Sequence, residues 1–459
     1  MDDLVQAGPE TLLPQVDGSY MLTESVYVMR GAILDLARPG GFILKMISNE
    51  KRFASIVADG GSVRIAGADI GRVTLESWDF PYERVRTDTE AGRAYVRVIG
   101  GSLVMAYTDV RALGFGTGGT GGVAVTQPTV PVTGLPAGEV LIEHDTVLGN
   151  AIGIFVSGGE NVVIADDIIR GSAGSGIVLR RPTAGALIQR VVSEQNNRDG
   201  IVVDRAQNVQ ISDSAVRDNV ANGFRLVGTA LYGHQTGGFG DNGIIRCIAA
   251  GSGRFGVEIV GGQSIELRDT VLAGGVSGVM VRDGASQIML AGNDIRHAQT
   301  GIMVRDSTVH LLGNAVYSAS VHGITLVGDL SGSVVRENSV DGRGPSAIDT
   351  RRARGPIEMS ANTTTGWSKT ANFGQQVREL FTPLLLVWCG IALCIARAAM
   401  RRPWSKFRNR GIAAGLRTHP YTNSRRLTAS SSPGEFSAAI VGESPAIGNA
   451  GASRNWSLR

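Results

Sequence analysis

The sequence is poor in the residues that build disulfide-stapled or metal-bound domains. It has 3 cysteines in 459 residues, which excludes a disulfide framework and a cysteine-rich zinc site. Aromatic residues make up only 5% of the chain, and its 6 histidines show no metal-ligand spacing. Helix signals are nearly absent between residues 60 and 360. We therefore expect no metal, no cofactor and no compact helical enzyme domain in this region.

Glycine, by contrast, is abundant and periodic, with 63 residues in the chain. Several glycines open a stretch of the form Gly-apolar-x-apolar, as in "GIVL", "GIVV" and "GIMV", and a second short strand-like stretch follows about nine residues later. Alternation with a period of two predicts strands with one inward and one outward face. The spacings between the opening residues are 23, 24, 23, 33, 22, 23, 22 and 24 for Gly153, Gly176, Gly200, Gly223, Gly256, Gly278, Gly301, Gly323 and Ala347.

This repeat predicts a parallel β-helix with coils of about 22–24 residues, because one unit cannot bury its apolar side without stacked neighbours. A β-propeller is disfavoured, since its blades need about 40 residues. Each opening glycine is expected at a tight corner, in a backbone conformation that a side chain would strain. We expect less regular coils over 1–139, the regular stack over 140–365 and a linker over 366–380.

An apolar run follows the predicted stack. Residues 381–396 ("FTPLLLVWCGIALCIA") carry no charge, and the run extends to Met400 with one interruption at Arg397. This length is close to that needed to cross a bilayer, so the sequence predicts a single transmembrane helix over 381–400 and the lipid bilayer as a partner. A buried core helix is the alternative, but a β-helix has no place for one.

The segment after this run, residues 401–459, holds ten Lys or Arg against two Glu and has little apolar periodicity, so we expect a disordered tail. Basic residues cluster next to the apolar run, which places the tail in the cytoplasm and the β-helix outside by the positive-inside rule. A nucleic-acid-binding arm explains this cluster less well, and no nucleic-acid partner is expected. The first residues, "MDDLVQAGPETLLPQVDG", do not form a signal peptide, so we expect that an export signal is missing from this chain.

Three landmarks precede the regular repeat: "SWD" at 77–79, "GRAYV" at 92–96 and "LGFG" at 113–116. In this order before Gly-Ile coils, they resemble the mannuronan C-5 epimerase family of right-handed, pectin-lyase-like β-helix proteins, over residues 20–345. The resemblance implies a carbohydrate groove along one stacked sheet, an anionic uronate polymer as ligand, and epimerisation at C-5 outside the cytoplasmic membrane.

Removal of a proton beside a carboxylate requires a base, a proton donor and a positive group, usually arginine. In the family, three consecutive coils carry Asp-Pro-His-Asp with its basic histidine, then Ser-Arg, then Leu-Asp-Arg. The third element matches "GIVVDRA", with Asp204 and Arg205, and the second matches "GIVLRRP" in part, with Arg180 and Arg181. The first reads "GIFVSGG" instead, so that Ser157 stands in the place of the histidine.

The predicted substrate-binding residues are therefore Arg180, Arg181, Asp204, Arg205, Asn196 and Ser157, and the catalytic residues are unknown. Asn196 fits one of two asparagine places of the family, while Val191 occupies the other. Weaker candidates are Tyr232 and His234 in the long insertion and His144 as a replacement base. The alternative for the charged residues is that they form ordinary ion pairs in solvent. The alternative for the remaining candidates is that they are turn or surface residues without a function.

Three functions remain open. The first is a membrane-anchored, non-catalytic relative of the epimerases that binds an extracytoplasmic polysaccharide. The second is an active epimerase or lyase on a uronate polymer with a relocated base. The third is a structural protein of the cell envelope.

Overall fold

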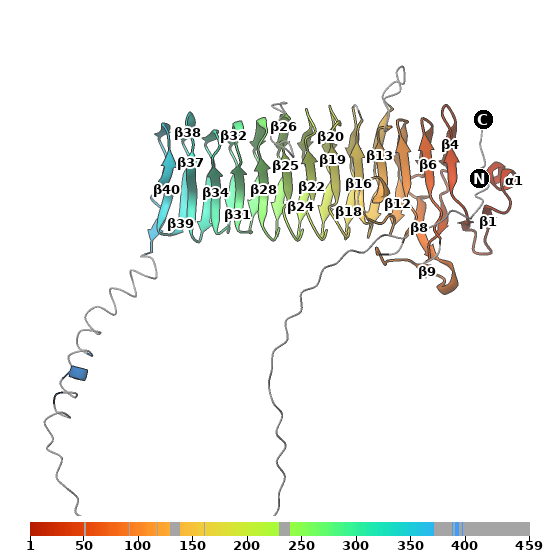
Figure 1. The fold of residues 1–459 in the computed structure, drawn as a ribbon, viewed down its shortest axis with the longest axis horizontal. Helices are drawn as coiled ribbons and strands as arrows, with labels where there is room; N and C mark the ends of the chain where they lie inside the picture. The colour runs from red at the N-terminus through yellow and green to blue at the C-terminus, as the bar shows by residue number, and fades with distance from the viewer. Residues whose placement is uncertain are drawn as a thin grey trace, which may run out of the picture. The chain divides into compact units, whose positions relative to one another are not determined.

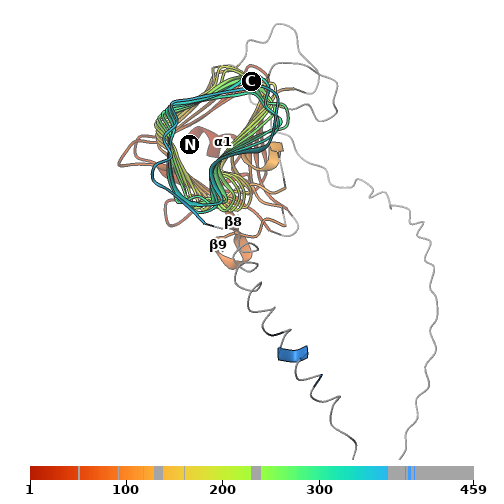
Figure 2. The ribbon, with the colours of Figure 1, turned by 90° about the vertical axis from the view of Figure 1, so that its left-hand side faces the viewer.

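The computed structural model describes residues 1–370 apart from 50–51, 91, 117, 129–137, 160 and 229–238, and beyond them only 388, 391–393 and 397. Within this part of the chain, the strands form three long parallel sheets that run side by side as a solenoid (Figure 1). Seen along the solenoid, successive coils superpose in one closed outline (Figure 2). The predicted parallel β-helix is confirmed.

We call the three sheets A, B and C. Sheet A has the order β1 (Leu12–Pro14), β2 (Tyr20–Leu22), β5 (Phe42–Ile47), β8 (Val73–Asp79), β12 (Thr108–Arg111), β15 (Thr146–Leu148), β18 (Ile168–Arg170), β21 (Val192–Glu194), β24 (Ala215–Arg217), β27 (Ile248–Ala250), β30 (Val271–Ala273), β33 (Asp294–Arg296), β36 (Ala315–Ala319), β39 (Ser339–Gly344) and β42 (Trp367–Lys369), with β9 (Arg84–Val85) beside β8.

Sheet B has the order β3 (Val26–Val28), β6 (Ile56–Asp59), β10 (Val96–Ile99), β13 (Gly122–Thr126), β16 (Ile152–Ser157), β19 (Ile177–Arg180), β22 (Ile201–Asp204), β25 (Phe224–Val227), β28 (Phe255–Val260), β31 (Ser277–Arg282), β34 (Thr300–Arg305), β37 (His322–Asp329) and β40 (Ser346–Arg354).

Sheet C has the order β4 (Ile33–Ala37), β7 (Ser62–Ala66), β11 (Leu103–Ala106), β14 (Val140–Glu143), β17 (Val163–Ala165), β20 (Leu187–Gln189), β23 (Gln210–Ser212), β26 (Gly240–Ile245), β29 (Gln263–Arg268), β32 (Ser286–Ala291), β35 (Val309–Leu312), β38 (Ser333–Arg336) and β41 (Ile357–Ser360). The described helices are α1 (Asp2–Ala7) and the short 3₁₀ turns η1 (Phe80–Tyr82) and η2 (Gly118–Thr120).

Each coil contributes three strands rather than the two expected from the sequence. The stretch "NVVIADDII" contains both β17 and β18, because Asp166 between them takes a left-handed φ of 59° and turns the chain from sheet C to sheet A. The same three sheets continue without a break across residue 139. The irregular N-terminal coils are therefore part of one stack with the regular ones.

The core consists of aliphatic columns inside the tube. On sheet B, Ile154, Ile177, Ile201 and Phe224 follow one another in register and are fully buried. Because equivalent residues of neighbouring coils lie about 4.8 Å apart, each side chain packs on the next along the axis. At the N-terminal end, Met1, Leu4 and Val5 of the α1 region pack against this core.

The opening glycines are required for a different reason from the one predicted. None of the eight from Gly153 to Gly323 has a left-handed φ. A Cβ atom on each would instead lie between 2.3 and 2.8 Å from the carbonyl oxygen of the residue that opens the next coil. The repeat is therefore fixed by close approach between neighbouring coils, not by backbone strain at the corner.

Asparagine side chains tie the coils together at the turn from sheet C to sheet A. The backbone N–H of Asn293 donates to Asn314 Oδ1 at 3.2 Å, and that of Asn314 donates to Asn338 Oδ1 at 2.9 Å. Their Nδ2 groups donate to the same oxygens and to carbonyl groups of the preceding coil. The ladder satisfies backbone groups that a buried turn would otherwise leave unpaired.

No helix among the described residues is long and apolar enough to cross a membrane. Most of the predicted span over 381–400, and the whole predicted tail over 401–459, lie outside the described residues. The transmembrane helix and the disordered tail therefore stay predictions.

Candidate functional site

Three of the predicted substrate-binding residues, Ser157, Arg180 and Asp204, lie on the outward face of sheet B. Ser157 lies beside Arg180, and Arg180 beside Asp204, through the parallel pairing of β16, β19 and β22. The column then continues through Val227, Val260, Arg282, Arg305 and Val327. The predicted register is confirmed up to this point. A bulge follows, so that Val327 pairs with Arg352 and not with Arg351 as the repeat spacing predicted.

Asp204 is held between two arginines. Arg205 donates from Nε to Oδ1 at 2.8 Å and from Nη2 to Oδ2 at 3.1 Å, and Arg180 Nε lies 3.3 Å from Oδ2. Hydrogen bonding to Asp204 raises the pKa of Arg205, so this guanidinium stays charged. Arg205 also takes a left-handed φ of 56°, which is uncommon for a residue with a side chain. Both carboxylate oxygens of Asp204 are thus engaged.

A groove of about 980 Å³ lies over this part of sheet B. Its apolar surface comes from residues such as Phe155, Val178 and Val202, and its charged side chains are Arg180, Arg198, Asp199, Asp204, Arg205 and Arg225. An apolar surface with a few charged groups matches the general character of small-molecule and sugar sites. The four arginines outnumber the two aspartates, so the lining carries a net positive charge.

Two of the three sequence landmarks, "GRAYV" and "LGFG", meet beside this groove. Arg93 of "GRAYV" is fully buried and donates to the carbonyl oxygens of Leu113 at 3.1 Å and Gly114 at 2.6 Å, within "LGFG". It also donates to Thr87 O at 3.3 Å and Gly149 O at 3.1 Å. Thr89 and Gly116, which flank these contacts in sequence, line the groove. Arg93 thus fixes the loops that form one end of the groove.

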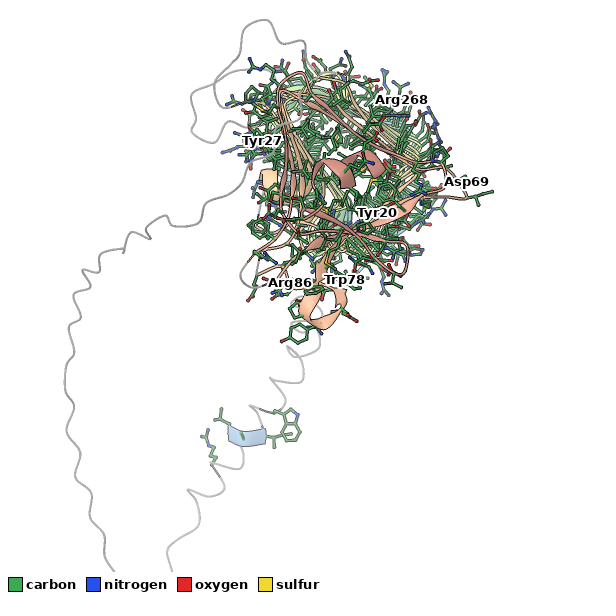
Figure 3. The ribbon with its side chains drawn as sticks, turned by 90° about the vertical axis from the view of Figure 1, so that its right-hand side faces the viewer. Tyr20, Tyr27, Asp69, Trp78, Arg86 and Arg268 are labelled. Atoms are coloured by element: carbon green, nitrogen blue, oxygen red, sulfur yellow. The ribbon has the colours of Figure 1, made fainter. Side chains whose placement is uncertain are left out.

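The "SWD" landmark supports the same region from sheet A. Arg86 Nη1 lies 3.3 Å from Oδ2 of the buried Asp79. Trp78 and Arg86 lie at the base of the hairpin that projects from the solenoid (Figure 3). This ion pair joins the strand β8 to the segment that leads toward Thr89, so the landmark has a structural role in the groove wall.

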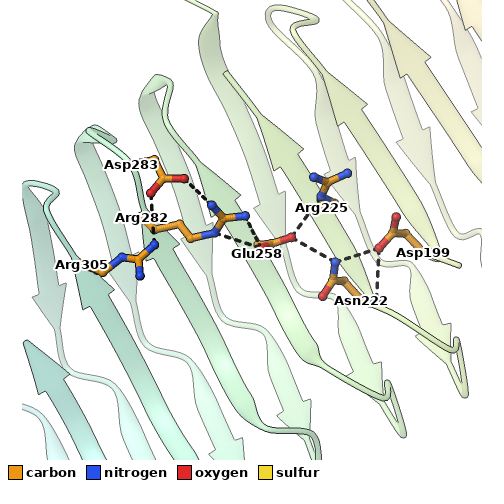
Figure 4. Close-up of polar contacts among 7 residues, drawn as sticks. All are labelled: Asp199, Asn222, Arg225, Glu258, Arg282, Asp283 and Arg305. Carbon is orange, nitrogen blue, oxygen red and sulfur yellow. Dashed lines mark hydrogen bonds and ion pairs between the residues drawn. The ribbon is translucent and has the colours of Figure 1, made fainter. Parts of the chain in front are cut away.

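A second polar network on sheet B was not predicted from the sequence (Figure 4). Asp199 Oδ1 accepts hydrogen bonds from the backbone N–H and Nδ2 of Asn222, at 3.1 and 2.8 Å. Asn222 Nδ2 also lies 3.1 Å from Glu258 Oε2, which accepts from Arg225 Nε at 3.0 Å. Arg282 donates from Nε and Nη2 to Glu258 Oε1 at 3.1 and 3.0 Å. The buried carboxylate of Glu258 thus joins two arginines.

The network continues along the face through Asp283, which contacts both Arg282 and Arg305. Arg282, Asp283 and Arg305 are thus linked to the buried Glu258. A signal for the network was present in the repeat: Arg225 and Glu258 occupy the second place after Gly223 and Gly256, and Asp199 and Asn222 precede Gly200 and Gly223.

Not all predicted site residues reach the groove. Ser157 donates from Oγ to the carbonyl oxygen of Arg181 at 3.1 Å, and Arg181 lies 5.9 Å from the centre of the Phe239 ring. Ser157 is the last residue of β16, Arg181 follows the end of β19, and neither is among the described groove lining. Tyr232 and His234 lie outside the described residues.

Two predicted residues lie elsewhere. Asn196 is fully buried in a ladder at the turn from sheet A to sheet B, where its side chain bonds to Ser172, Ser193 and Asn219. A polymer on the surface cannot reach it, so the prediction that Asn196 contacts substrate is wrong. His144 stacks on Tyr107 with ring centres 4.8 Å apart, at the turn from sheet C to sheet A. It is not among the described groove lining.

Among the residues that the structure describes, no group of three His, Cys, Asp or Glu side chains could hold a metal ion.

Comparison with known proteins assigns the family. The sequence profile described as "Right handed beta helix region" matches residues 117–232 and 228–364, more than half of the chain. The chain therefore belongs to this family of right-handed β-helix proteins. No curated protein matches the chain by sequence.

Solved structures show the same fold. The chain is similar to the crystal structure of the periplasmic alginate epimerase AlgG, with 16% identity, a TM-score of 0.59, and 81% of this chain and 83% of that chain covered. It also matches the A-module of the mannuronan C-5 epimerase AlgE6 of Azotobacter vinelandii, with 14% identity, a TM-score of 0.39, and coverage of 76% and 91%. At these identities, the first likeness establishes the fold of an epimerase-like right-handed β-helix, as the sequence landmarks predicted, and the second adds nothing to it.

Proposed function

We propose that the protein binds an anionic polysaccharide, a uronate polymer, in the groove on sheet B. The observation that carries this proposal is the set of four arginines in the groove lining, Arg180, Arg198, Arg205 and Arg225, around an apolar surface. Guanidinium groups bind carboxylates through paired hydrogen bonds, while the apolar side chains accept the faces of sugar rings. The likeness to the periplasmic alginate epimerase AlgG supports the same class of ligand.

The position at which the family resemblance expects a base does not support chemistry. The Ser157 hydroxyl donates to a backbone carbonyl and has no activating group beside it among the described contacts. Binding without chemistry at this rung is therefore the function that Ser157, Arg180 and Asp204 support best, as in a non-catalytic relative of the epimerases. The alternative of an enzyme requires a base from another rung.

The test is a titration of the full chain with polymannuronate and with a neutral glucan, followed by calorimetry. Wild-type protein should bind the anionic polymer only. Arg180→Ala and Arg225→Ala should each weaken binding about tenfold, or about 1.4 kcal/mol. Arg246→Ala is the matched control, because Arg246 forms an exposed ion pair with Asp213 at the turn from sheet C to sheet A. Equal binding of both polymers, or equal losses in all three variants, would refute the proposal.

We further propose that the run over 381–400 anchors the protein in the cytoplasmic membrane with the β-helix outside. Support comes from the uncharged stretch 381–396 within it and from the basic residues that follow. The full chain should then stay with membranes in alkaline carbonate, and the β-helix should be open to protease added outside. Replacing Leu385 and Ile391 by arginine should release the chain. A wild-type chain that carbonate extracts would rule the anchor out.

A further inference from the structure

We propose that the hairpin over residues 77–86 is a membrane-contacting element, whose tip places the rings of Phe80 and Tyr82 in the interfacial layer of a lipid bilayer. The hairpin follows the "SWD" landmark and projects from the solenoid (Figure 3). Its residues belong neither to the described groove lining nor to the apolar run over 381–400, so this contact lies beyond the two functions proposed for those parts.

The tip of the hairpin exposes two aromatic side chains. Phe80 is 51% exposed and Tyr82 is 70% exposed, with the exposed Pro81 between them. Single exposed apolar residues are common on soluble proteins, but two large rings on one projecting hairpin form a contact surface. The Arg84 guanidinium lies 5.2 Å from the centre of the Tyr82 ring, and within the described part of the chain the Tyr82 hydroxyl has no hydrogen-bond partner.

The base of the hairpin holds this tip in a fixed position. Strand β9 pairs antiparallel with β8, and the backbone N–H of Arg86 donates to the carbonyl oxygen of Ser77 at 2.9 Å. Glu83 turns the chain with a left-handed φ of 47°. The side chain of Arg86 lies 3.3 Å from the buried carboxylate of Asp79. An ordered tip loses little conformational freedom when it binds, which favours contact with a surface.

The chemistry of the tip matches the membrane–water interface. Tyrosine is enriched there because its ring is apolar while its hydroxyl bonds to water and headgroups. Between residues 80 and 85, the charged side chains are Glu83 and Arg84, one of each sign. Contact at the tip therefore depends on buried apolar area and not on the charge of the headgroups. We expect the tip to bind neutral and anionic lipids alike.

The place of the hairpin in the fold favours a bilayer over a protein partner. The hairpin extends sheet A at β8, and the same sheet supplies β42, the last described strand, which ends at Lys369. The apolar run begins twelve residues later, at 381, and twelve residues reach at most about 40 Å. An inserted run therefore keeps the end of sheet A close to the bilayer. This anchor supports the placement of the hairpin, but the contact of the tip does not require it.

The outward face of sheet A is suited to lie along the bilayer between these two points. From β8 to β42 the sheet makes eleven strand-to-strand steps, or roughly 50 Å at about 4.8 Å each. Three large apolar side chains are exposed on this face, each beside a buried residue of its own strand: Ile168, Ile248 and Tyr317. The hairpin at one end and the chain exit at the other would hold the solenoid axis parallel to the bilayer.

The test uses the full chain with Leu385→Arg and Ile391→Arg, which disable the proposed anchor. This protein is sedimented with vesicles of phosphatidylcholine, without and with phosphatidylglycerol. The salt concentration is raised from about 0.1 to about 1 M, which shortens the range of charge interactions from about 10 to about 3 Å. We expect binding to both kinds of vesicle at both salt concentrations.

Substitutions at the tip identify the hairpin as the source of this binding. Phe80→Ala with Tyr82→Ala should weaken it at least about tenfold, and Phe80→Trp with Tyr82→Trp should retain it. Ile33→Ala with Ile70→Ala is the matched control, because both isoleucines are exposed in the same coils, on sheet C and at the turn from sheet C to sheet A. The control should bind as tightly as the protein with an intact tip.

Three outcomes would overturn the proposal. Binding that requires phosphatidylglycerol, is lost in 1 M salt and is unchanged by the alanine pair would belong to the basic residues 401–459. Protein that binds neither kind of vesicle leaves the tip without a bilayer partner. Dimers in analytical ultracentrifugation that the alanine pair abolishes would assign the tip to a second copy of the chain. A wild-type chain that carbonate extracts refutes only the anchor, because the hairpin is tested with the anchor already disabled.

Discussion

The carboxylate of Asp167 accepts a hydrogen bond at 2.7 Å from the backbone N–H of Asp145, so that two buried aspartates stack in neighbouring coils. They occupy the turn that holds Asn293 and Asn314 in later coils. The second oxygen, Oδ2, of each aspartate is buried without a partner. Burial raises the pKa of both well above the ordinary value, and the charge of Asp145 adds to the shift at Asp167.

This pair predicts a stability that falls as the pH rises. Because the folded-state pKa values are raised, the stability that these groups contribute is complete below the unfolded-state pKa, near 4, and is lost as the pH passes through the folded-state values. Asp145→Asn supplies an amide donor in place of the unpaired oxygen. We expect it to raise the free energy of unfolding by about 1–3 kcal/mol at neutral pH and to flatten the pH dependence.

Urea unfolding at pH 4 and pH 8 measures this effect. Asp69→Asn is the control, because Asp69 is exposed and forms no described side-chain contact (Figure 3). Its stability should follow that of the wild type at both pH values. An Asp145→Asn variant less stable than the wild type at pH 8 would show that the aspartates are held as charged groups.

Interrupting the asparagine ladder should lower the free energy of unfolding. Asn314→Ala removes the acceptor for the backbone N–H of Asn293 and the donor to the carbonyl oxygen of Leu290. With two buried polar groups left unpaired, we expect a loss of about 3 kcal/mol in unfolding free energy. Asn197→Ala, at an exposed turn position, should change it by less than about 0.5 kcal/mol. Equal effects in both variants would mean that the ladder contributes little.

The repeat glycines should not tolerate alanine. In Gly200→Ala, the new Cβ would lie 2.7 Å from Gly223 O and 2.9 Å from Val216 Cγ1. Neighbouring coils must move apart, so we expect a loss of more than about 2 kcal/mol in unfolding free energy. Gly40→Ala is the matched control, since nothing lies within 4 Å of a Cβ there. Thermal unfolding of both variants measures the difference in stability. A Gly200→Ala variant as stable as Gly40→Ala would contradict the prediction.

Arg93 should couple stability to ligand binding. Burial lowers its pKa to about 10, which still leaves it charged at neutral pH. Lysine cannot reproduce the planar fork that reaches four carbonyl oxygens, so Arg93→Lys should lose about 2–4 kcal/mol of unfolding free energy. The groove wall that it fixes should loosen, and polymannuronate affinity should fall. Arg64→Lys, at an exposed ion pair with Asp35, should change neither quantity.

The sequence by itself determined the fold and the register of the groove. A period near 23 residues with Gly-apolar-x-apolar stretches requires stacked coils, since only stacking buries the apolar face. Once the strand period is known, the spacing places Ser157, Arg180 and Asp204 in one column. Local patterns suffice because neighbours in a solenoid are always one repeat apart in sequence.

Only the tertiary structure decided which polar residues face the groove. Asn196 and Asp199 are three residues apart, yet the turn before β22 places the first inside the tube and the second in the groove lining. The role of Arg93 depends on three loops that meet in space, and the reason for the glycines is a carbonyl group in the next coil. Such contacts depend on the distances between coils and on the directions of side chains at irregular turns. The alternation of inward and outward residues within a strand carries no information on either.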